Sequence, residues 1–216
     1  MADMFLVRSV NVGSAEAIEG GKGIPTGIGK RPVETLEIRD PGPKHGGLGS
    51  GVVGDFIGDV AHHGGNGQAV YAVAREELDW WGRELGRDLP DGLFGENLTI
   101  EGMDVDDAVL GERWAVGDEV VLEVSGPRIP CQTFAARMAE PHWVKRFAAR
   151  ARSGAYLSVV TPGTVRRGDG IRVVSRPDHG IDVPTTFRAF MGDRAAVARI
   201  LGAGAGTEEL RAELRG

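Results

Sequence analysis

Glycine accounts for 34 of the 216 residues, and its distribution restricts how this chain can fold. The glycines follow no fixed period, which excludes collagen-like chains and repeat arrays. They separate many short apolar runs, and some of these runs, such as residues 33–38, alternate apolar with polar residues. Short runs bounded by turn residues are typical of strands joined by tight turns. We therefore expect a mainly β fold.

Strand-like runs recur along most of the chain, at residues 5–12, 33–38, 68–74, 94–102 and 154–160. Gly-Asp pairs provide turn signals at positions 54–55, 117–118 and 168–169, and Gly-Asp between apolar runs is typical of hairpins. Together these features predict an antiparallel β-barrel with inserted helices.

Helical periodicity appears in two segments of the predicted barrel domain. In residues 75–86, Leu78, Trp81 and Leu85 recur at i, i+3 and i+7, which defines one face of a helix. Gly86 is a suitable C-terminal stop, and the tryptophan pair is expected to pack in the core and at its rim. Residues 133–151 are predicted to be helical on both sides of a proline.

The tail has a different character, because it contains no strand candidate. It is predicted to form three short helices, broken at residues 192–193 and at 202–206. We place a domain boundary near residue 180, which gives a β-barrel domain at 1–179 and a helical appendix at 180–216. The appendix is too short for a core of its own.

Charge and cysteine content limit the classes of function. The net charge of −6 argues against a general nucleic-acid surface, so any anion site must be local. One cysteine forms no intramolecular disulfide, which fits a reducing cytoplasm. The first residues do not resemble a secretory signal, and no apolar run approaches the roughly 18 residues that span a membrane. We expect a cytoplasmic protein that binds neither nucleic acid nor membranes.

Cys131 is the only cysteine and lies in a loop stiffened by prolines. A thiolate is a nucleophile and a soft-metal ligand, and a nearby cation or helix N-terminus favours it. Arg128 lies three residues earlier, and a helix is expected to start at Gln132 or Thr133. The alternative is a buried cysteine that acts as a small apolar side chain.

Three other segments carry candidate polar groups. Lys30 and Arg31 follow two glycines, and backbone amides beside glycines together with two cations suit the binding of a phosphate or carboxylate. The order of these residues is not that of a P-loop. A solvated loop with no bound anion is an equal alternative. Glu96 is either a general acid or base or a surface carboxylate, and Asn97 either closes a turn or holds a polar ring system. The adjacent histidines at 62 and 63 lack metal-ligand spacing, so either one imidazole enters a pocket or both are exposed.

Five motifs occur in a characteristic order: "TGIGKRPV", "GDFIGDVAHHGGNGQAVYAV", "FGENLTI", "GDEVVLEVSGPRIPC" and "GAYLSVVTPGTVRRGD". Together they resemble the MOSC domain family, named for the C-terminal part of molybdenum-cofactor sulfurases. The resemblance is strongest to the bacterial branch linked to resistance against hydroxylaminopurine. It covers roughly residues 5–177, and the tail resembles the three-helix appendix of that branch.

The resemblance implies a MOSC-type β-barrel and a bound molybdenum cofactor (molybdopterin), a pterin dithiolene with a terminal phosphate. Cys131 matches the cysteine that ligates the metal in related amidoxime-reducing enzymes, where soft dithiolene sulfurs hold the same metal. Lys30 and Arg31 match a basic pair that contacts the cofactor. Gly67 and Gln68 fall in a second contact segment, and Tyr156 matches an aromatic position near the cofactor. Ile129 and Pro130 flank Cys131 and would offer backbone groups to the cofactor. Asn97 and Arg128 are further candidates for cofactor binding.

One position departs from the family pattern. The amidoxime-reducing enzymes have an arginine two residues before the asparagine, where this chain has Gly95. This difference leaves the phosphate contacts of that segment open, with Arg128 or Arg166 as candidates for the missing charge.

The resemblance further implies an oxidoreductase that reduces N-hydroxylated compounds, such as N-hydroxylated purine bases. Cys131 would be its metal ligand and catalytic residue, and Glu96 or a water chain would supply protons. A separate electron-donor reductase is implied, because the sequence shows no Fe–S, flavin or haem motif. The alternatives are a non-catalytic cofactor carrier, a sulfur carrier with a persulfide on Cys131, and a barrel without cofactor. A homodimer is kept open.

Overall fold

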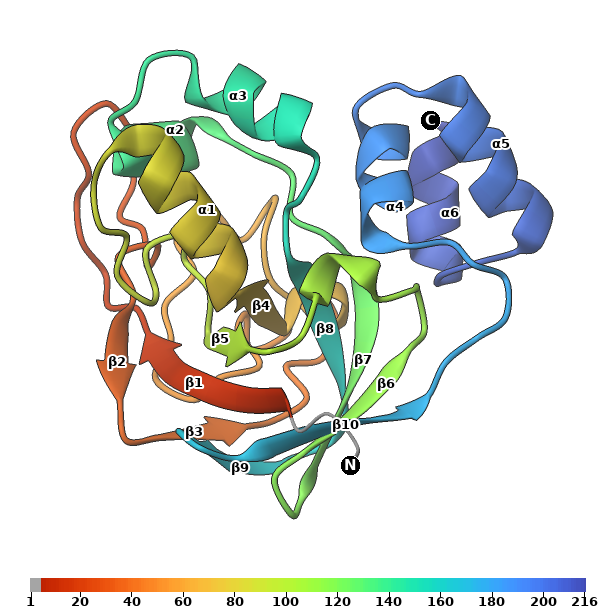
Figure 1. The fold of residues 1–216 in the computed structure, drawn as a ribbon, viewed down its shortest axis with the longest axis horizontal. Coiled ribbons are helices and arrows are strands. Elements are labelled where there is room, and N and C mark those ends of the chain that lie inside the picture. The colour runs from red at the N-terminus through yellow and green to blue at the C-terminus, as the bar shows by residue number, and fades with distance from the viewer. Residues whose placement is uncertain (1–4) are drawn as a thin grey trace.

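The computed structural model describes residues 5–216 and shows a closed β-barrel with helices around it (Figure 1). Around the barrel the strands follow the order β10 (Gly170–Ser175), β6 (Arg113–Val116), β7 (Val120–Pro127), β8 (Ala155–Thr161), β4 (Val70–Ala74), β5 (Leu98–Glu101) and β1 (Phe5–Val12). Pairing of β1 with β10 closes the barrel. The predicted barrel is confirmed; residues 1–4 of its expected domain lie outside the described residues.

Three further strands extend this framework. β2 (Arg31–Val33) pairs with β1, and β3 (Thr35–Ile38) pairs with β9 (Gly163–Arg166) in a separate two-stranded sheet. The expectation of a wholly antiparallel barrel is wrong for one pair, because β4 and β5 are parallel. The helix α1 (Arg75–Leu85) lies between these two strands in sequence and provides the crossover that a parallel pair requires.

The Gly-Asp turns have different outcomes. The turn at 117–118 joins β6 to β7, which pair with each other as predicted. A hairpin at 168–169 is wrong, because β9 pairs with β3 whereas β10 pairs with β6 and β1. Asp169 explains this corner: its side chain accepts from the Arg166 N–H at 2.7 Å, and its carbonyl accepts from the Val7 N–H at 2.9 Å. The chain therefore passes from one sheet to the other.

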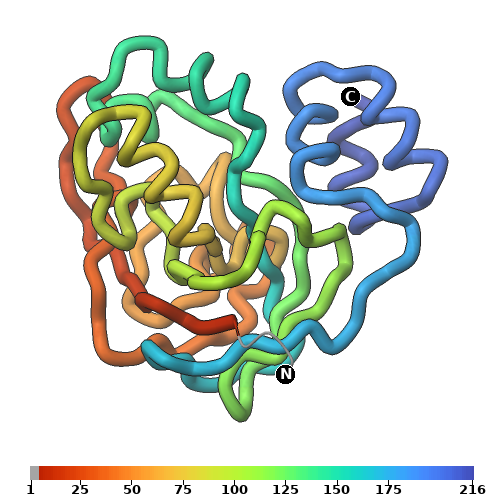
Figure 2. The backbone as a smooth tube through the Cα atoms, in the orientation of Figure 1, coloured from red at the N-terminus to blue at the C-terminus, as the bar shows by residue number. Residues whose placement is uncertain are grey.

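Helices α1, α2 (Gln132–Met138) and α3 (Trp143–Arg150) cover one end of the barrel (Figures 1 and 2). They enclose an aromatic cluster in which the Trp81 and Trp143 ring centres lie 4.6 Å apart. Trp81 is buried and Trp80 is half-buried, which confirms the predicted core and rim. Helix α1 ends at Gly86 in the left-handed conformation, also as predicted.

The tail forms the three predicted helices, α4 (Val183–Phe190), α5 (Arg194–Ala203) and α6 (Glu208–Arg215). It is anchored on the barrel: Val183 packs in the barrel core and Phe187 in the aromatic cluster. Leu110 from the barrel completes the small apolar core of the tail. The division at residue 180 stays a prediction. Within residues 5–216, no helix has the length and apolar character needed to cross a membrane.

Candidate functional site

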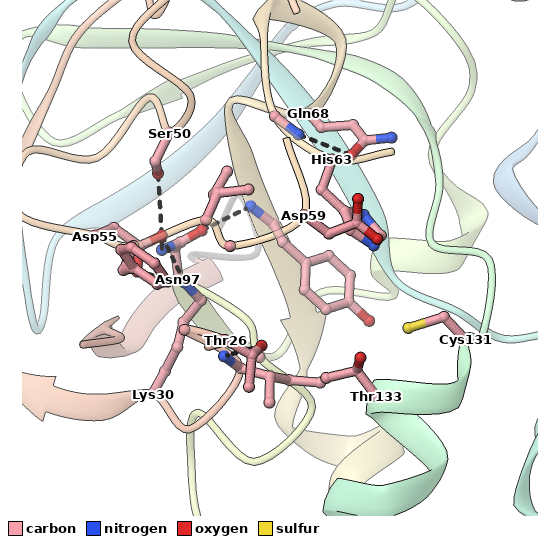
Figure 3. Close-up of a pocket in the computed structure, with 18 of the residues that line it drawn as sticks. Thr26, Lys30, Ser50, Asp55, Asp59, His63, Gln68, Asn97, Cys131 and Thr133 are labelled. Carbon is pink, nitrogen blue, oxygen red and sulfur yellow. Dashed lines mark hydrogen bonds and ion pairs between the residues drawn. The ribbon is translucent and has the colours of Figure 1, made fainter. Parts of the chain in front are cut away.

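Loops 24–30 and 50–64 and the start of α2 surround a pocket (Figure 3). Residues of β4, of β8 and of the turn before β5 complete its lining. About 740 Å³ of space lies between the lining atoms, part of it open to solvent. The pocket thus combines segments from five separate parts of the sequence.

Loops 24–30 and 50–64 form one wall of the pocket, and glycines allow the backbones in this wall to approach each other closely. A Cβ on Gly27 would lie 2.0 Å from the carbonyl oxygen of Phe56, and one on Gly13 would lie 1.9 Å from the carbonyl oxygen of Gly27. No side chain fits at such distances, so the three backbones stack only because these positions are glycine. This packing accounts for part of the unusual glycine content.

A buried ion pair holds this wall together. The Lys30 Nζ lies 2.5 Å from both carboxylate oxygens of Asp55. Asp55 also accepts hydrogen bonds from the Gly13 N–H, the Ser50 hydroxyl and the Asn97 amide. Burial lowers the pKa of Lys30 below its ordinary value, and the opposing charge of Asp55 offsets only part of this effect. Lys30 is therefore neutralised by Asp55 and is not a free cation in the pocket.

Asn97 joins three elements at the pocket. Its Oδ1 accepts from the Tyr71 N–H at 3.2 Å, and its Nδ2 donates to the Asn11 carbonyl at 3.3 Å and to Asp55 at 3.1 Å. The turn before it is braced by Glu96, which accepts from the Gly92 N–H at 2.5 Å. These hydrogen bonds hold the Asn97 side chain in one orientation at the edge of the pocket.

Glu96 itself lies behind the wall. Its side chain is fully buried, is not part of the pocket lining, and also accepts from the Phe94 N–H and the Thr99 hydroxyl. Burial raises the pKa of this carboxyl to about 7. Its contacts are those of a brace for the turn, so its predicted proton-supplying role gains no support from its position.

Arg128 is the buried cation of the pocket that has no acidic partner. Its Nη1 donates to the Tyr156 hydroxyl at 3.2 Å, and its guanidinium carbon lies 4.6 Å from the centre of the Phe134 ring. Its Nε has no hydrogen-bond partner, and within residues 5–216 no carboxylate lies within ion-pair distance. A buried unpaired charge is costly. The site therefore favours an anionic ligand.

Cys131 lines the same pocket and directly precedes α2, which begins at Gln132 as predicted. Its carbonyl accepts from the Ala135 N–H at 3.0 Å, which fixes the start of the helix. The thiol is free and partly exposed. The pocket thus combines a free thiol with an unpaired cation.

The two histidines lie in different environments, which agrees with the predicted alternative that one imidazole enters a pocket. His63 lines the pocket, whereas His62 is exposed and bonds to Asp59 at 2.8 Å. Burial, followed by the charge of Arg128, lowers the pKa of His63 to about 4.

The remaining predicted positions divide between the pocket and its surroundings. Gln68 and Tyr156 line it. Arg31 and Arg166 are exposed on β2 and β9, Ile129 packs against the aromatic cluster, and the Gly67 carbonyl accepts from Ser125. None of these four, nor Pro130, belongs to the lining. The roles of all these residues stay predictions.

Gly95 explains the departure from the family pattern. It lines the pocket with φ at +85°, and a Cβ there would lie 2.9 Å from the Ile28 side chain. An arginine is therefore disfavoured at this position. Sequence reasoning missed Asp55 and Tyr71 as pocket residues, and only the Gly-Asp turn signal marked the former.

A family model of the MOSC domain matches residues 59–172, more than half of the chain. The chain belongs to the MOSC domain family. MOSC domains are associated with binding of the molybdenum cofactor, so membership gives this chain a molybdenum-cofactor-associated role. The predicted MOSC-type fold is thereby confirmed.

Individual MOSC-like proteins agree with this assignment. "Uncharacterized protein YflK" of Bacillus subtilis is 31% identical over 214 residues, which cover 97% of this chain and 93% of YflK. A protein named "Reductase" from Gibberella moniliformis is 34% identical over 131 residues, 59% of this chain but 23% of that protein. The crystal structure of YiiM from Geobacillus stearothermophilus has a TM-score of 0.74 at 25% identity, covering 98% of this chain and 97% of YiiM.

Proposed function

We propose that this MOSC protein binds the molybdenum cofactor in the pocket and reduces the N–O bond of N-hydroxylated compounds, such as N-hydroxylated purine bases. The observation that supports it most directly is the pairing of Arg128 with Cys131 in one cavity. Arg128 is buried and unpaired, and Cys131 is a free thiol. A cofactor with a phosphate and a thiolate-ligated soft metal matches both features.

Different residues of the pocket would bind different parts of the cofactor. The Cys131 thiolate would ligate the metal, and Arg128, held by Tyr156, would neutralise an anionic part of the cofactor. Gln68 offers an amide group to a polar ring, whereas both amide hydrogens of Asn97 are already donated to Asn11 and Asp55. When bound, the cofactor supplies a two-electron redox centre. Lys30 contributes indirectly, because its ion pair with Asp55 keeps Asn97 in place.

We further propose that the electrons come from a separate reductase partner, since the sequence carries no Fe–S, flavin or haem motif. The Gibberella moniliformis protein named "Reductase" contains its similar segment within a much longer chain. The name of that protein supports an oxidoreductase-type role for proteins with this segment.

Molybdenum content tests the binding step. Wild type, Cys131→Ala, Arg128→Gln and Arg172→Gln would be produced in a host with abundant cofactor and measured by elemental mass spectrometry. We expect near-stoichiometric metal in wild type and in Arg172→Gln, whose side chain is exposed on β10 outside the pocket, and a sharp fall in the other two. Full metal in Cys131→Ala would refute the ligand assignment. No metal in wild type would refute the cofactor proposal and favour a persulfide carrier.

Turnover tests the reaction. Loaded protein would be supplied with reduced methyl viologen and 6-N-hydroxylaminopurine, and formation of the amine would be followed by chromatography. We expect turnover in wild type and none in Cys131→Ala. Stoichiometric molybdenum without any turnover would refute the reductase and leave a cofactor carrier.

A further inference from the structure

Reduction of a hydroxylamine requires protons as well as electrons. Each cycle adds two electrons and two protons to R–NH–OH, breaks the N–O bond, and releases R–NH₂ and water. The pocket therefore needs a side chain that donates a proton to the leaving oxygen. This requirement rests on the proposed function.

Most ionisable groups of the pocket are committed to other contacts. Lys30 and Asp55 form the buried ion pair of the wall. Asp59 bonds to Lys22 at 2.7 Å and to His62 at 2.8 Å, and these bonds hold the pKa of its carboxyl well below its usual range. It therefore stays ionised and has no proton to donate near neutral pH.

The tyrosines are also poorly suited to this task. The Tyr71 hydroxyl donates to the Ser153 carbonyl at 2.6 Å, and burial raises its pKa well above the ordinary value. The Tyr156 hydroxyl accepts from Arg128. The Arg128 guanidinium stays protonated, and Cys131 is reserved as the metal ligand. The remaining ionisable pocket residue is His63.

The backbone around His63 directs its imidazole inward. The Asp59 carbonyl accepts from the His63 N–H at 2.9 Å, which closes the turn. Gly64 follows with φ at +91°, and its N–H donates to Gln68 at 3.2 Å. In Figure 3, His63 and Asp59 extend from this loop into the cavity that Cys131 lines.

We propose that His63 is the catalytic proton donor of this pocket. Its imidazolium gives one proton to the hydroxylamine oxygen as the N–O bond breaks, and this oxygen leaves as water. Solvent supplies the second proton and reprotonates the imidazole. The electron pair comes from the external reductant through the loaded site.

The charges that act on His63 connect its protonation to ligand binding. Arg128 and Lys22 disfavour the imidazolium, whereas Asp59 and a hydrogen bond with the Gln68 side chain favour it. An anion bound to Arg128 cancels the larger of the two repulsive charges. Burial, the largest cause of the low pKa of His63, persists in the loaded pocket, but we expect cancellation of the Arg128 charge to raise this pKa above about 4.

Nuclear magnetic resonance gives a readout that is independent of turnover. The imidazole signals of His63 would be assigned by their absence in His63→Gln and titrated in loaded and unloaded protein. A clear upward shift of its pKa on loading supports the proposal. An equal pKa in both states overturns it.

Kinetics with reduced methyl viologen and 6-N-hydroxylaminopurine provide the second test. We expect His63→Gln to keep its molybdenum and to lose roughly 10²–10⁴-fold in kcat, together with the basic limb of the pH profile. His62→Gln is the matched control, because His62 is adjacent but exposed, and it should retain the wild-type rate.

The failures are distinguishable. Wild-type turnover with an unchanged rate and pH profile in His63→Gln overturns the role of His63 alone. Loss of molybdenum from His63→Gln overturns it as well and makes His63 a cofactor-binding residue. No turnover in loaded wild type refutes the proposed reaction, and this role with it.

Discussion

The Lys30 ammonium lies 2.5 Å from both carboxylate oxygens of Asp55, and both side chains are almost completely buried. Removal of one partner would leave the other charge buried without compensation. We expect Lys30→Met to lower the free energy of unfolding by about 3–5 kcal/mol in urea denaturation. Lys22→Met, which removes an exposed partner of Asp59, is the control and should change it little. Equal effects of the two variants would contradict the structural role of the buried pair.

Glu96 makes stability depend on pH. Burial raises its pKa to about 7 in the folded chain, above the ordinary value of 4.5, so folding favours its protonated form. Its contribution is complete below pH 4.5 and is lost as the pH rises through about 7. We expect wild type to lose on the order of 3 kcal/mol more than Glu96→Gln between pH 4.5 and 8, measured by urea unfolding. Parallel pH curves for the two proteins would show that Glu96 is not the group responsible.

Gly27 is expected to tolerate no side chain. A Cβ there would lie 2.0 Å from the Phe56 carbonyl, so Gly27→Ala must push loops 24–30 and 50–64 apart. We expect a fall in the melting temperature and in molybdenum content. Gly170→Ala is the comparison, because open space surrounds that position. If Gly27→Ala melted and bound metal like Gly170→Ala, the close packing of the loops would be wrong.

Phe187 tests whether the tail unfolds with the barrel. It lies on α4 but is buried in the aromatic cluster beneath α1–α3, with its ring centre 6.2 Å from that of Phe147. Phe187→Ala should destabilise the protein by about 3–5 kcal/mol and shift a single calorimetric transition. Met191→Ala, at an exposed position, should have little effect. Two separate transitions in wild type would instead support an independent appendix beyond residue 180.

Much of the fold is predictable because its signals are local. The period of Leu78, Trp81 and Leu85 defines α1, and the glycine-rich breaks divide the tail into its helices. Strand pairing is not local. The turn at 168–169 has the residues of a hairpin, yet Asp169 binds Val7 of the neighbouring strand β1, and β9 and β10 pair with other strands.

The candidate site was partly predictable for the same reason. The motif around Cys131 and Arg128 identifies both pocket residues from a single segment. The partnership of Lys30 with Asp55 joins residues 25 positions apart, and no spacing rule reveals that the lysine is already neutralised. Burial also determines that Glu96 braces a turn, whereas the sequence presents it only as an ionisable group.

Closure of the barrel between β1 and β10 has a consequence for biosynthesis. Phe5 pairs with Ile171, so the first strand has to wait for the last one before the ring is complete. Such distant pairing slows folding. A ribosome would have to release residue 171 from its exit tunnel before the pocket could assume its final shape. Cofactor insertion is therefore expected to be a late event, after most of the polypeptide has been translated.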